Sequence, residues 1–231
     1  MISAIIQARE DSSRLPNKIF KKIIDDDNSL SLILKRLNKS KKIDKIIIAV
    51  PNQSKKFDSL KKKFKNIEVF KGNKYNVLKR YHSAASFFNI STIIRITSDC
   101  PLIDFRLIDK MIKNFQKYKV DYYSNCISRS FPDGYDIEVF NFKSLNFAFK
   151  NAKSKYDKEH VTPYLIKSNK IKKRNYKISP NLYFLRCTLD DINDLKFIRK
   201  IYKLFAPRIY FGYQDVKKLF YKNPNFFIKK W

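Results

Sequence analysis

Short apolar runs alternate with amphipathic segments through the first half of the chain. Leu30, Ile33, Leu34 and Leu37, for example, recur at the i, i+3, i+4, i+7 spacing of one helix face. This alternation predicts strands at residues 3–7, 45–50, 67–70 and 92–97, and helices at 29–39, 57–64, 76–88 and 108–115. Strands that alternate with helices in this way form βαβ units, so we expect a mainly parallel sheet.

The pattern is looser after residue 120. It predicts strands at residues 120–124, 135–140 and 183–189, and helices at 142–151, 157–168, 191–205 and 214–221. No internal repeat or low-complexity linker divides the chain. We therefore expect one doubly wound α/β domain over residues 1–231, with a regular half at 1–119 and a less regular half at 120–231.

The formal net charge of +29 raises the hypothesis of a nucleic-acid-binding module. Lysines are spread over the whole sequence, however, and glycine is scarce (3 residues) while Lys, Ile, Asn, Phe and Tyr are abundant. That composition is typical of an AT-rich genome, so it favours codon bias over a nucleic-acid partner. A positive field also attracts a nucleoside triphosphate. A polyanion- or RNA-binding relative without catalysis remains an alternative.

Nothing in the sequence indicates membrane insertion or secretion. No stretch approaches the roughly 18 uncharged apolar residues of a membrane helix, and the first residues lack the basic flank and cleavage site of a signal peptide. Cys100, Cys126 and Cys187 are far apart and form no CxxC pair. We expect a cytoplasmic protein with reduced thiols, no membrane partner and no structural zinc.

The loop after the first predicted strand, residues 7–18, is rich in phosphate-binding groups. Arg9, Arg14 and Lys18 place three cations within ten residues, and Ser12 begins a pair of serines that adds hydroxyl donors. Ligands of open α/β sheets bind beyond the carboxyl ends of strands, where loop amides and basic groups can clamp a phosphate. A solvated basic loop is the alternative. The Walker pattern GxxxxGK[ST] is absent, so this is not a P-loop.

A second informative loop, residues 95–104, follows the fourth predicted strand. Asp99 comes directly after the strand and is followed by a turn at Pro101. A carboxylate in this place is suited to hold Mg²⁺ against phosphate oxygens. Helix capping is the alternative for both acids of the loop; we favour the metal for Asp99 and the cap for Asp104.

Six motifs follow one another in a recognisable order. They are QAR-x-x-SSRLP-x-K, G-x(4)-VL-x-RY-x-x-AA, R-I-T-x-DCPLID, P-x-G-x-D-x-EVF, EHVTPY and R-x-TLD-x-x-x-DL. In order and spacing they resemble the spore-coat polysaccharide cytidylyltransferase family, a branch of the acylneuraminate and 3-deoxy-manno-octulosonate cytidylyltransferases. The likeness runs from Ile2 to about Asn225, nearly the whole chain.

The resemblance implies a Rossmann-like, GT-A-like nucleotidyltransferase fold with a mostly parallel mixed sheet and helices on both faces. It implies that CTP and a sugar, expected to be a keto-acid sugar, give CMP-sugar and pyrophosphate with Mg²⁺, for a surface polysaccharide or glycan. Another nucleotide or a non-acid sugar is the alternative. The nucleotide would bind the half at 1–119 and the sugar the half at 120–231, which is also compatible with a homodimer.

The motifs carry the family's functional positions over to this chain. The resemblance assigns Ala8, Arg9, Ser12, Arg14, Lys18, Gly72 and Arg80 to the nucleotide, Asp99 and Asp190 to the metal, and Asp136, Glu138, Glu159 and His160 to the sugar side. Arg9, Lys18, Asp99 and Asp190 are the expected catalytic residues, because transfer at a charged phosphate depends on positioning and charge neutralisation. N-capping of the next helix is the alternative for Asp190.

The chain departs from the family pattern near the phosphate loop. Asp11 and Asn17 stand where glycine is usual, and asparagine tolerates a left-handed backbone. Glu10 and Asp11 put two carboxylates beside the expected triphosphate, which should weaken binding unless they point elsewhere. Lys74 and Tyr75 stand where acidic residues are often found.

Overall fold

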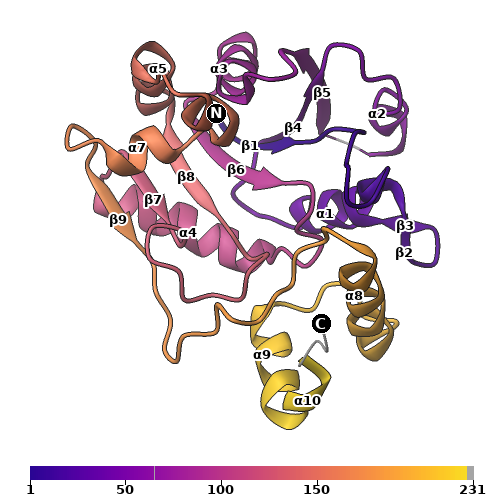
Figure 1. The fold of residues 1–231 in the computed structure, drawn as a ribbon. Helices are drawn as coiled ribbons and strands as arrows, with labels where there is room; N and C mark the ends of the chain where they lie inside the picture. Colours follow the sequence, from indigo (N-terminus) through magenta and orange to yellow (C-terminus); the bar gives the residue numbers. More distant parts are fainter. Residues whose placement is uncertain (65, 228–231) are drawn as a thin grey trace.

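A computed structural model, which describes residues 1–64 and 66–227, has a seven-stranded sheet with helices on both faces (Figure 1). The strands lie in the order β5-β4-β1-β6-β8-β7-β9. Their bounds are β1 Ile2–Gln7, β4 Lys45–Pro51, β5 Ile67–Gly72, β6 Thr92–Thr97, β7 Tyr122–Ser124, β8 Glu138–Asn141 and β9 Lys173–Asn175. The hairpin β2 (Lys22–Ile24) and β3 (Asp27–Asn28) forms a separate small sheet.

The pairing of the strands divides the sheet at β6. β5, β4, β1 and β6 are parallel neighbours, whereas β8 runs antiparallel to both β6 and β7, and β9 is parallel to β7. The chain order reverses at β1, because β4 lies on one side of it and β6 on the other. The prediction of a mainly parallel mixed sheet in an α/β fold is confirmed.

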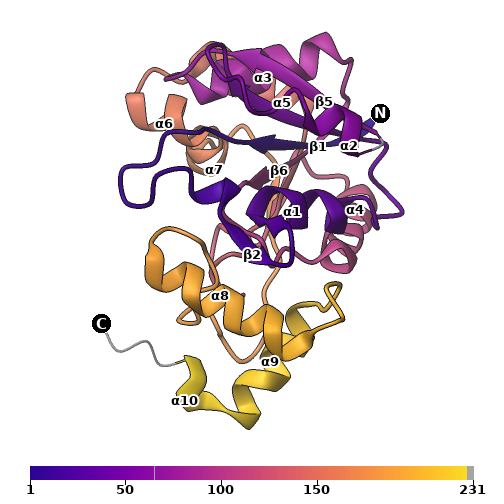
Figure 2. The same ribbon diagram turned by 90° about the vertical axis from the view of Figure 1, so that its right-hand side faces the viewer.

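The helices bury alternate side chains of the sheet on its two faces. Ala4 and Ile6 of β1 join a core with α1, α4 and α8, whereas Ile5 joins a second core with α3, α5 and α7. Figure 2 shows α3 and α5 above the sheet, α1 and α4 below it, and α8 to α10 beyond them. The helices are α1 Ser29–Leu37, α2 Leu60–Lys63, α3 Val77–Phe87, α4 Phe105–Tyr118, α5 Phe142–Asn151, α6 Lys155–His160, α7 Pro163–Lys167, α8 Ile192–Phe205, α9 Tyr213–Lys222 and α10 Pro224–Phe227; the 3₁₀ turn η1 covers Lys18–Phe20.

Asp104 caps α4, as its position after the β6 loop predicts. Its side chain accepts a hydrogen bond from Arg106 N at 3.0 Å and another from Tyr213 N at 3.1 Å. The second bond brings the start of α9 against α4. A Cβ atom on Gly212 would lie 2.2 Å from Asp104 Oδ2, so only glycine permits this approach.

Three predicted elements differ from the structure. Residues 183–189 are not a strand and contribute only an isolated bridge between Asp133 and Arg186. The helix predicted at 157–168 is broken into α6 and α7, because Val161 has a φ of 72° and ends the first helix. The helix predicted at 57–64 shrinks to the four residues of α2.

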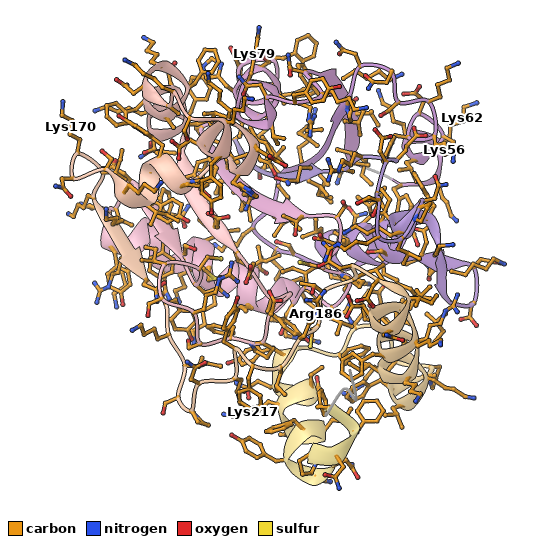
Figure 3. All side chains as sticks on the ribbon, viewed as in Figure 1. Lys56, Lys62, Lys79, Lys170, Arg186 and Lys217 are labelled. Carbon is orange, nitrogen blue, oxygen red and sulfur yellow. The ribbon has the colours of Figure 1, made fainter. Side chains whose placement is uncertain are left out.

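Basic side chains project from many sides of the molecule. Figure 3 labels Lys62, Lys79, Lys170 and Lys217, which come from α2, α3, the turn before β9, and α9, and which lie on different sides of the view. This distribution agrees with a charge spread over the whole chain. Among the residues that the structure describes, no helix combines the length and apolar character that a bilayer crossing requires.

Candidate active site

Two loops that follow neighbouring parallel strands form the centre of the candidate site. β1 ends at Gln7 and β6 ends at Thr97, and these two residues are partners in the parallel register. The loops that follow, residues 8–17 and 98–104, therefore leave the same edge of the sheet. Because the strand order reverses here, this is the place where open α/β sheets bind their ligands.

Asp99 and Asp190 meet at the ammonium group of Lys18. Lys18 Nζ lies 3.1 Å from Asp99 Oδ2 and 2.9 Å from Asp190 Oδ1, although the two acids are 81 and 172 positions away from it in the chain. Arg14 adds a guanidinium nitrogen 3.0 Å from the same Asp190 oxygen. We call Lys18, Asp99 and Asp190 the Lys18 cluster. Asp99 and Asp190, which the resemblance assigns to the metal, therefore lie close together beside the first loop.

Asp190 is held in place by its own segment and by α8. Leu189 N donates to Asp99 O at 2.8 Å, which fixes the extended segment before Asp190 against the β6 loop. Arg186, near the centre of Figure 3, contacts Asp190 Oδ2 at 3.0 Å and binds both carboxylate oxygens of Asp194. Asp191 caps α8, so the capping alternative for Asp190 is wrong.

Lys18 and Asp99 hold each other in their charged forms. Burial would raise the pKa of Asp99, but the Lys18 charge and the Thr97 hydroxyl outweigh it and hold the pKa below its ordinary value. Burial would lower the pKa of Lys18, but Asp99 and Asp190 outweigh it and raise the pKa. Both Asp99 and Lys18 are therefore charged at neutral pH.

The donor set of this cluster fits a Mg²⁺ ion that arrives with phosphates. Two carboxylates already converge on one cationic atom, and Mg²⁺ in nucleotide sites is typically held by one or two carboxylates together with substrate phosphates and water. Within residues 1–64 and 66–227, no three His, Cys, Asp or Glu side chains gather closely enough to hold a metal alone. The protein thus offers part of a coordination shell.

Glu10 and Asp11 are engaged by neighbouring loops. Glu10 Oε1 accepts hydrogen bonds from the backbone of Lys55 at 3.0 Å and Lys56 at 3.3 Å. Asp11 Oδ2 lies 2.7 Å from Lys74 Nζ, and this hydrogen bond and charge lower the pKa of Asp11. The two departures from the family pattern, an acid at 11 and a lysine at 74, therefore compensate each other.

The first loop surrounds a hollow of 550 Å³, lined by Glu10, Asp11, Ser12, Ser13, Pro16 and Asn17. Ala8 is buried, Ser12 is half-buried, and Arg9 is exposed. Asn17 has a φ of 54°, which is the left-handed conformation that glycine or asparagine accepts most readily.

Arg80 is buried beneath the loop that follows β5. It is 3% exposed, and its Nη1 donates to Asn73 O at 2.6 Å. A Cβ on Gly72 would lie 3.0 Å from Arg80 Cγ, so a small residue suits this contact. Burial lowers the pKa of Arg80, and the nearby positive charge of Arg9 adds to this effect. Arg9 and Arg80 therefore lie near enough to each other for their positive charges to interact.

A second pocket of 440 Å³ lies beside the cluster; we call it the side pocket. It is lined by Arg95, Thr97, Cys126, Arg129, Asp136, Glu138, Tyr156, His160, Thr162, Pro163, Ile166 and Lys167. Arg129 Nη1 binds Asp136 Oδ2 at 2.6 Å, and Glu138 pairs with Arg95 and accepts a hydrogen bond from the Tyr122 hydroxyl. Burial raises the pKa of Asp136, although Arg129 opposes it.

Of the four residues assigned to the sugar, three line the side pocket. Asp136 and Glu138 lie on one side and His160 on the α6–α7 side, where its ring packs 4.4 Å from that of Tyr156. Glu159 is exposed on α6 and is not part of this lining.

Sequence reasoning missed Arg95, Arg129 and Arg186. Arg95 carried a signal, since it is a charged residue within the otherwise apolar run of β6. Arg186 also carried a signal, because it opens the motif R-x-TLD-x-x-x-DL. Arg129 lies in an irregular loop, and its partner can be identified only in three dimensions. His82, by contrast, packs between the rings of Phe142 and Phe149 away from the site.

The chain is similar to several known proteins over most of its length. It is 39% identical over 211 residues to an uncharacterized protein of Methanocaldococcus jannaschii, covering 88% of this chain and 84% of that protein. It is 27% identical over 232 residues to the spore coat polysaccharide biosynthesis protein SpsF of Bacillus subtilis, covering 96% and 94%.

Solved structures give the same result. A cytidylyltransferase from Leptospira borgpetersenii superposes with a TM-score of 0.91 at 30% identity, covering 100% of this chain and 98% of that one. CMP:2-keto-3-deoxy-manno-octonic acid synthetase in complex with CTP shares the fold, with a TM-score of 0.66 at 12% identity over 88% and 99% of the two chains. The model of the cytidylyltransferase family matches residues 3–221, and this chain therefore belongs to that family.

Proposed function

We propose that the protein transfers CMP from CTP to a hydroxyl group of a keto-acid sugar, with Mg²⁺, for a surface polysaccharide or glycan. Membership of the cytidylyltransferase family supports a CTP-using transfer. The relative named for spore coat polysaccharide biosynthesis and the fold shared with a keto-deoxy sugar synthetase support the choice of acceptor. The observation that carries the proposal is the meeting of Asp99 and Asp190 at Lys18 beside the first loop.

In this proposal the nucleotide lies along the edge of the sheet beyond β1. Arg9, Ser12, Arg14 and Lys18 contact the triphosphate, and Ala8 with residues 72–80 borders the base and ribose. Arg9 and Arg80 both add positive charge to this part of the molecule, which favours an anionic ligand. Asp11 is neutralised by Lys74 and does not oppose the phosphates.

Asp99 and Asp190 would hold the Mg²⁺ ion. When bound, the ion would neutralise phosphate charge and favour ionisation of the attacking hydroxyl. Arg186 keeps Asp190 Oδ2 occupied, so its Oδ1 is the oxygen presented towards Asp99.

The chemistry makes one phosphorus–oxygen bond and breaks another. The sugar hydroxyl loses its proton to solvent, and its oxygen forms a bond to the α-phosphorus of CTP while the bond from that phosphorus to the bridging oxygen of the β-phosphate breaks, so that pyrophosphate leaves with that electron pair. Arg9 and Lys18 would stabilise the charge on the leaving group. Catalysis then rests on alignment and charge, which a rigid strand-end site can supply.

The sugar would occupy the side pocket, which begins next to the Lys18 cluster at Thr97. Asp136 and Glu138 can accept hydrogen bonds from sugar hydroxyl groups, whereas His160 and Lys167 on the opposite side suit a carboxylate. Because Glu159 lies outside the lining, we assign the contact in this segment to His160.

Pyrophosphate release tests the proposal directly. Incubation with CTP, Mg²⁺ and a panel of keto-acid sugars is expected to release pyrophosphate with at least one sugar, and CTP should exceed UTP, GTP and ATP. A preference for another nucleotide, or activity with neutral sugars alone, would mean that the nucleotide or the acceptor differs from the one proposed. Absence of pyrophosphate release with every sugar and all four nucleotides would contradict the proposal.

Replacement of Lys74 by alanine is expected to weaken CTP binding a few-fold, because the Asp11 charge would then oppose the triphosphate. Removing both side chains, in Asp11→Ala/Lys74→Ala, should restore nearly the original affinity. Isothermal titration with CTP at low and high salt measures both effects, and the difference should shrink at high salt. Equal weakening in the single and double variants would show that Lys74 acts without Asp11.

A further inference from the structure

Lys18 occupies the position between Asp99 and Asp190 that a divalent cation would need. Its side chain is only 16% exposed, and so is that of Asp190. The ammonium contacts one oxygen of each acid, at 3.1 and 2.9 Å. These two contacts use the oxygens that the two carboxylates direct towards each other, so Lys18 and a metal ion compete for them.

We propose that Lys18 is a stand-in cation that holds Asp99 and Asp190 together until a nucleotide delivers Mg²⁺. This inference rests on the proposed function, because it concerns the same two carboxylates. Its consequence is an order of binding. Free Mg²⁺ or Mn²⁺ binds the protein poorly, whereas the metal–nucleotide complex binds well.

The charges around Lys18 explain this order. A free metal ion would have to expel the ammonium from two carboxylates and leave it partly buried without an anion, which is costly. A nucleotide supplies phosphate oxygens beside the same loop, so Lys18 can exchange its carboxylates for phosphates on its flexible four-carbon side chain. Asp190 keeps Arg186 on its other oxygen, Oδ2, so it does not depend on Lys18 alone for its position. Arg14, which lies 3.0 Å from the Oδ1 that Lys18 contacts, would move to the phosphates together with Lys18.

Binding of Mn²⁺ alone, measured by electron paramagnetic resonance without nucleotide, tests the inference apart from turnover. Lys18→Met removes the competing charge and keeps the side-chain length. This variant is expected to bind Mn²⁺ at least about tenfold more tightly than the wild type, because two neighbouring carboxylates lose their internal cation. Lys18→Met/Asp99→Asn should return to weak binding, which locates the ion at this pair.

Lys71→Met is the matched control, because Lys71 pairs at 2.8 Å with Asp58 on the surface. It should bind Mn²⁺ as weakly as the wild type. If Lys18→Met does not fold, thermal denaturation of the wild type tests the inference instead. Mn²⁺ together with CTP should raise the melting temperature, whereas Mn²⁺ alone should leave it unchanged.

Tight Mn²⁺ binding by the nucleotide-free wild type would overturn the inference, and so would unchanged affinity in Lys18→Met. In both cases CTP binding and pyrophosphate release would still support the proposed function. If the wild type bound neither CTP nor its Mn²⁺ complex, the proposed function itself would fail.

Discussion

Replacing Asp99 by asparagine is expected to lower the rate of pyrophosphate release by about 100-fold or more, with little change in the fold. The asparagine side chain would keep the shape of the aspartate but lose the charge that faces Lys18 and the proposed metal. Because transfer at the α-phosphate depends on charge neutralisation, the loss should fall mainly on kcat. Steady-state kinetics with CTP and the accepted sugar measure it.

The fold of this variant is checked by thermal denaturation. Lys18 keeps Asp190 as a partner, so we expect a stability change of about 1 kcal/mol or less, a shift of about 2–4 °C in a domain of this size. Asp58→Asn, which removes a surface carboxylate paired with Lys71, should retain full activity. Normal turnover in Asp99→Asn would rule out Asp99 as a metal ligand.

Most of the first half of the fold could be predicted because its segments carry complete patterns. The runs that become β1, β4, β5 and β6 are short and apolar, and α1 and α3 each have one buried apolar face, whereas α2 has no buried residue and is shorter than predicted. Parallel pairing then follows from the alternation alone. The two loops of the site could be placed for the same reason, because they follow β1 and β6.

The segment 183–189 has the burial pattern of a strand without being one. Leu185, Cys187 and Leu189 are buried in alternation, as in a strand. Their backbone, however, bonds to two different loops: Cys187 N donates to Asp133 O, and Leu189 N donates to Asp99 O. Alternation reports which side chains are buried, but it does not reveal whether a neighbouring strand exists.

The sequence pattern does not predict β9, because its residues are polar. Lys173, Arg174 and Asn175 follow two further basic residues, and such a run is typical of a solvated connection. The strand lies at the edge of the sheet beside β7, where charged side chains are common because they discourage pairing with other chains. Its sequence therefore lacks the apolar signal of an inner strand.

The contacts of the Lys18 cluster lay beyond the reach of sequence reasoning. The family motifs indicate that Asp99 and Asp190 act together and that Lys18 belongs to the phosphate loop. They do not indicate that Lys18 bridges both acids, because this depends on the path of residues 181–190 past the β6 loop. The ion pair between Asp11 and Lys74 could not be predicted either. Each residue departs separately from the family pattern, and only the structure brings the two together.

Replacing Glu138 by alanine is expected to lower the free energy of unfolding by about 3–5 kcal/mol, because it leaves a buried charge without its partner. Glu138 is 3% exposed and pairs with Arg95 while accepting a hydrogen bond from the hydroxyl group of Tyr122. Burial lowers the pKa of Arg95, but Glu138 outweighs it and raises the pKa. Without Glu138 this support is lost, but the ordinary pKa of arginine lies so far above neutrality that the guanidinium would stay charged.

Urea unfolding followed by circular dichroism measures this loss, and Glu138→Gln separates its causes. Glutamine keeps the volume and can still accept a hydrogen bond, so the cost should be smaller than for alanine. Glu68→Ala, which removes a partly exposed partner of Lys61, should cost at most about 1 kcal/mol. Arg95 also donates a hydrogen bond to Gln7 Oε1 at 3.1 Å. A cost for Glu138→Ala no larger than for Glu68→Ala would mean that Arg95 reaches water or that this bond to Gln7 is enough to stabilise it. This part of the lining of the side pocket would then be adaptable, whereas a large cost would identify the pair of Arg95 and Glu138 as a rigid part of that lining.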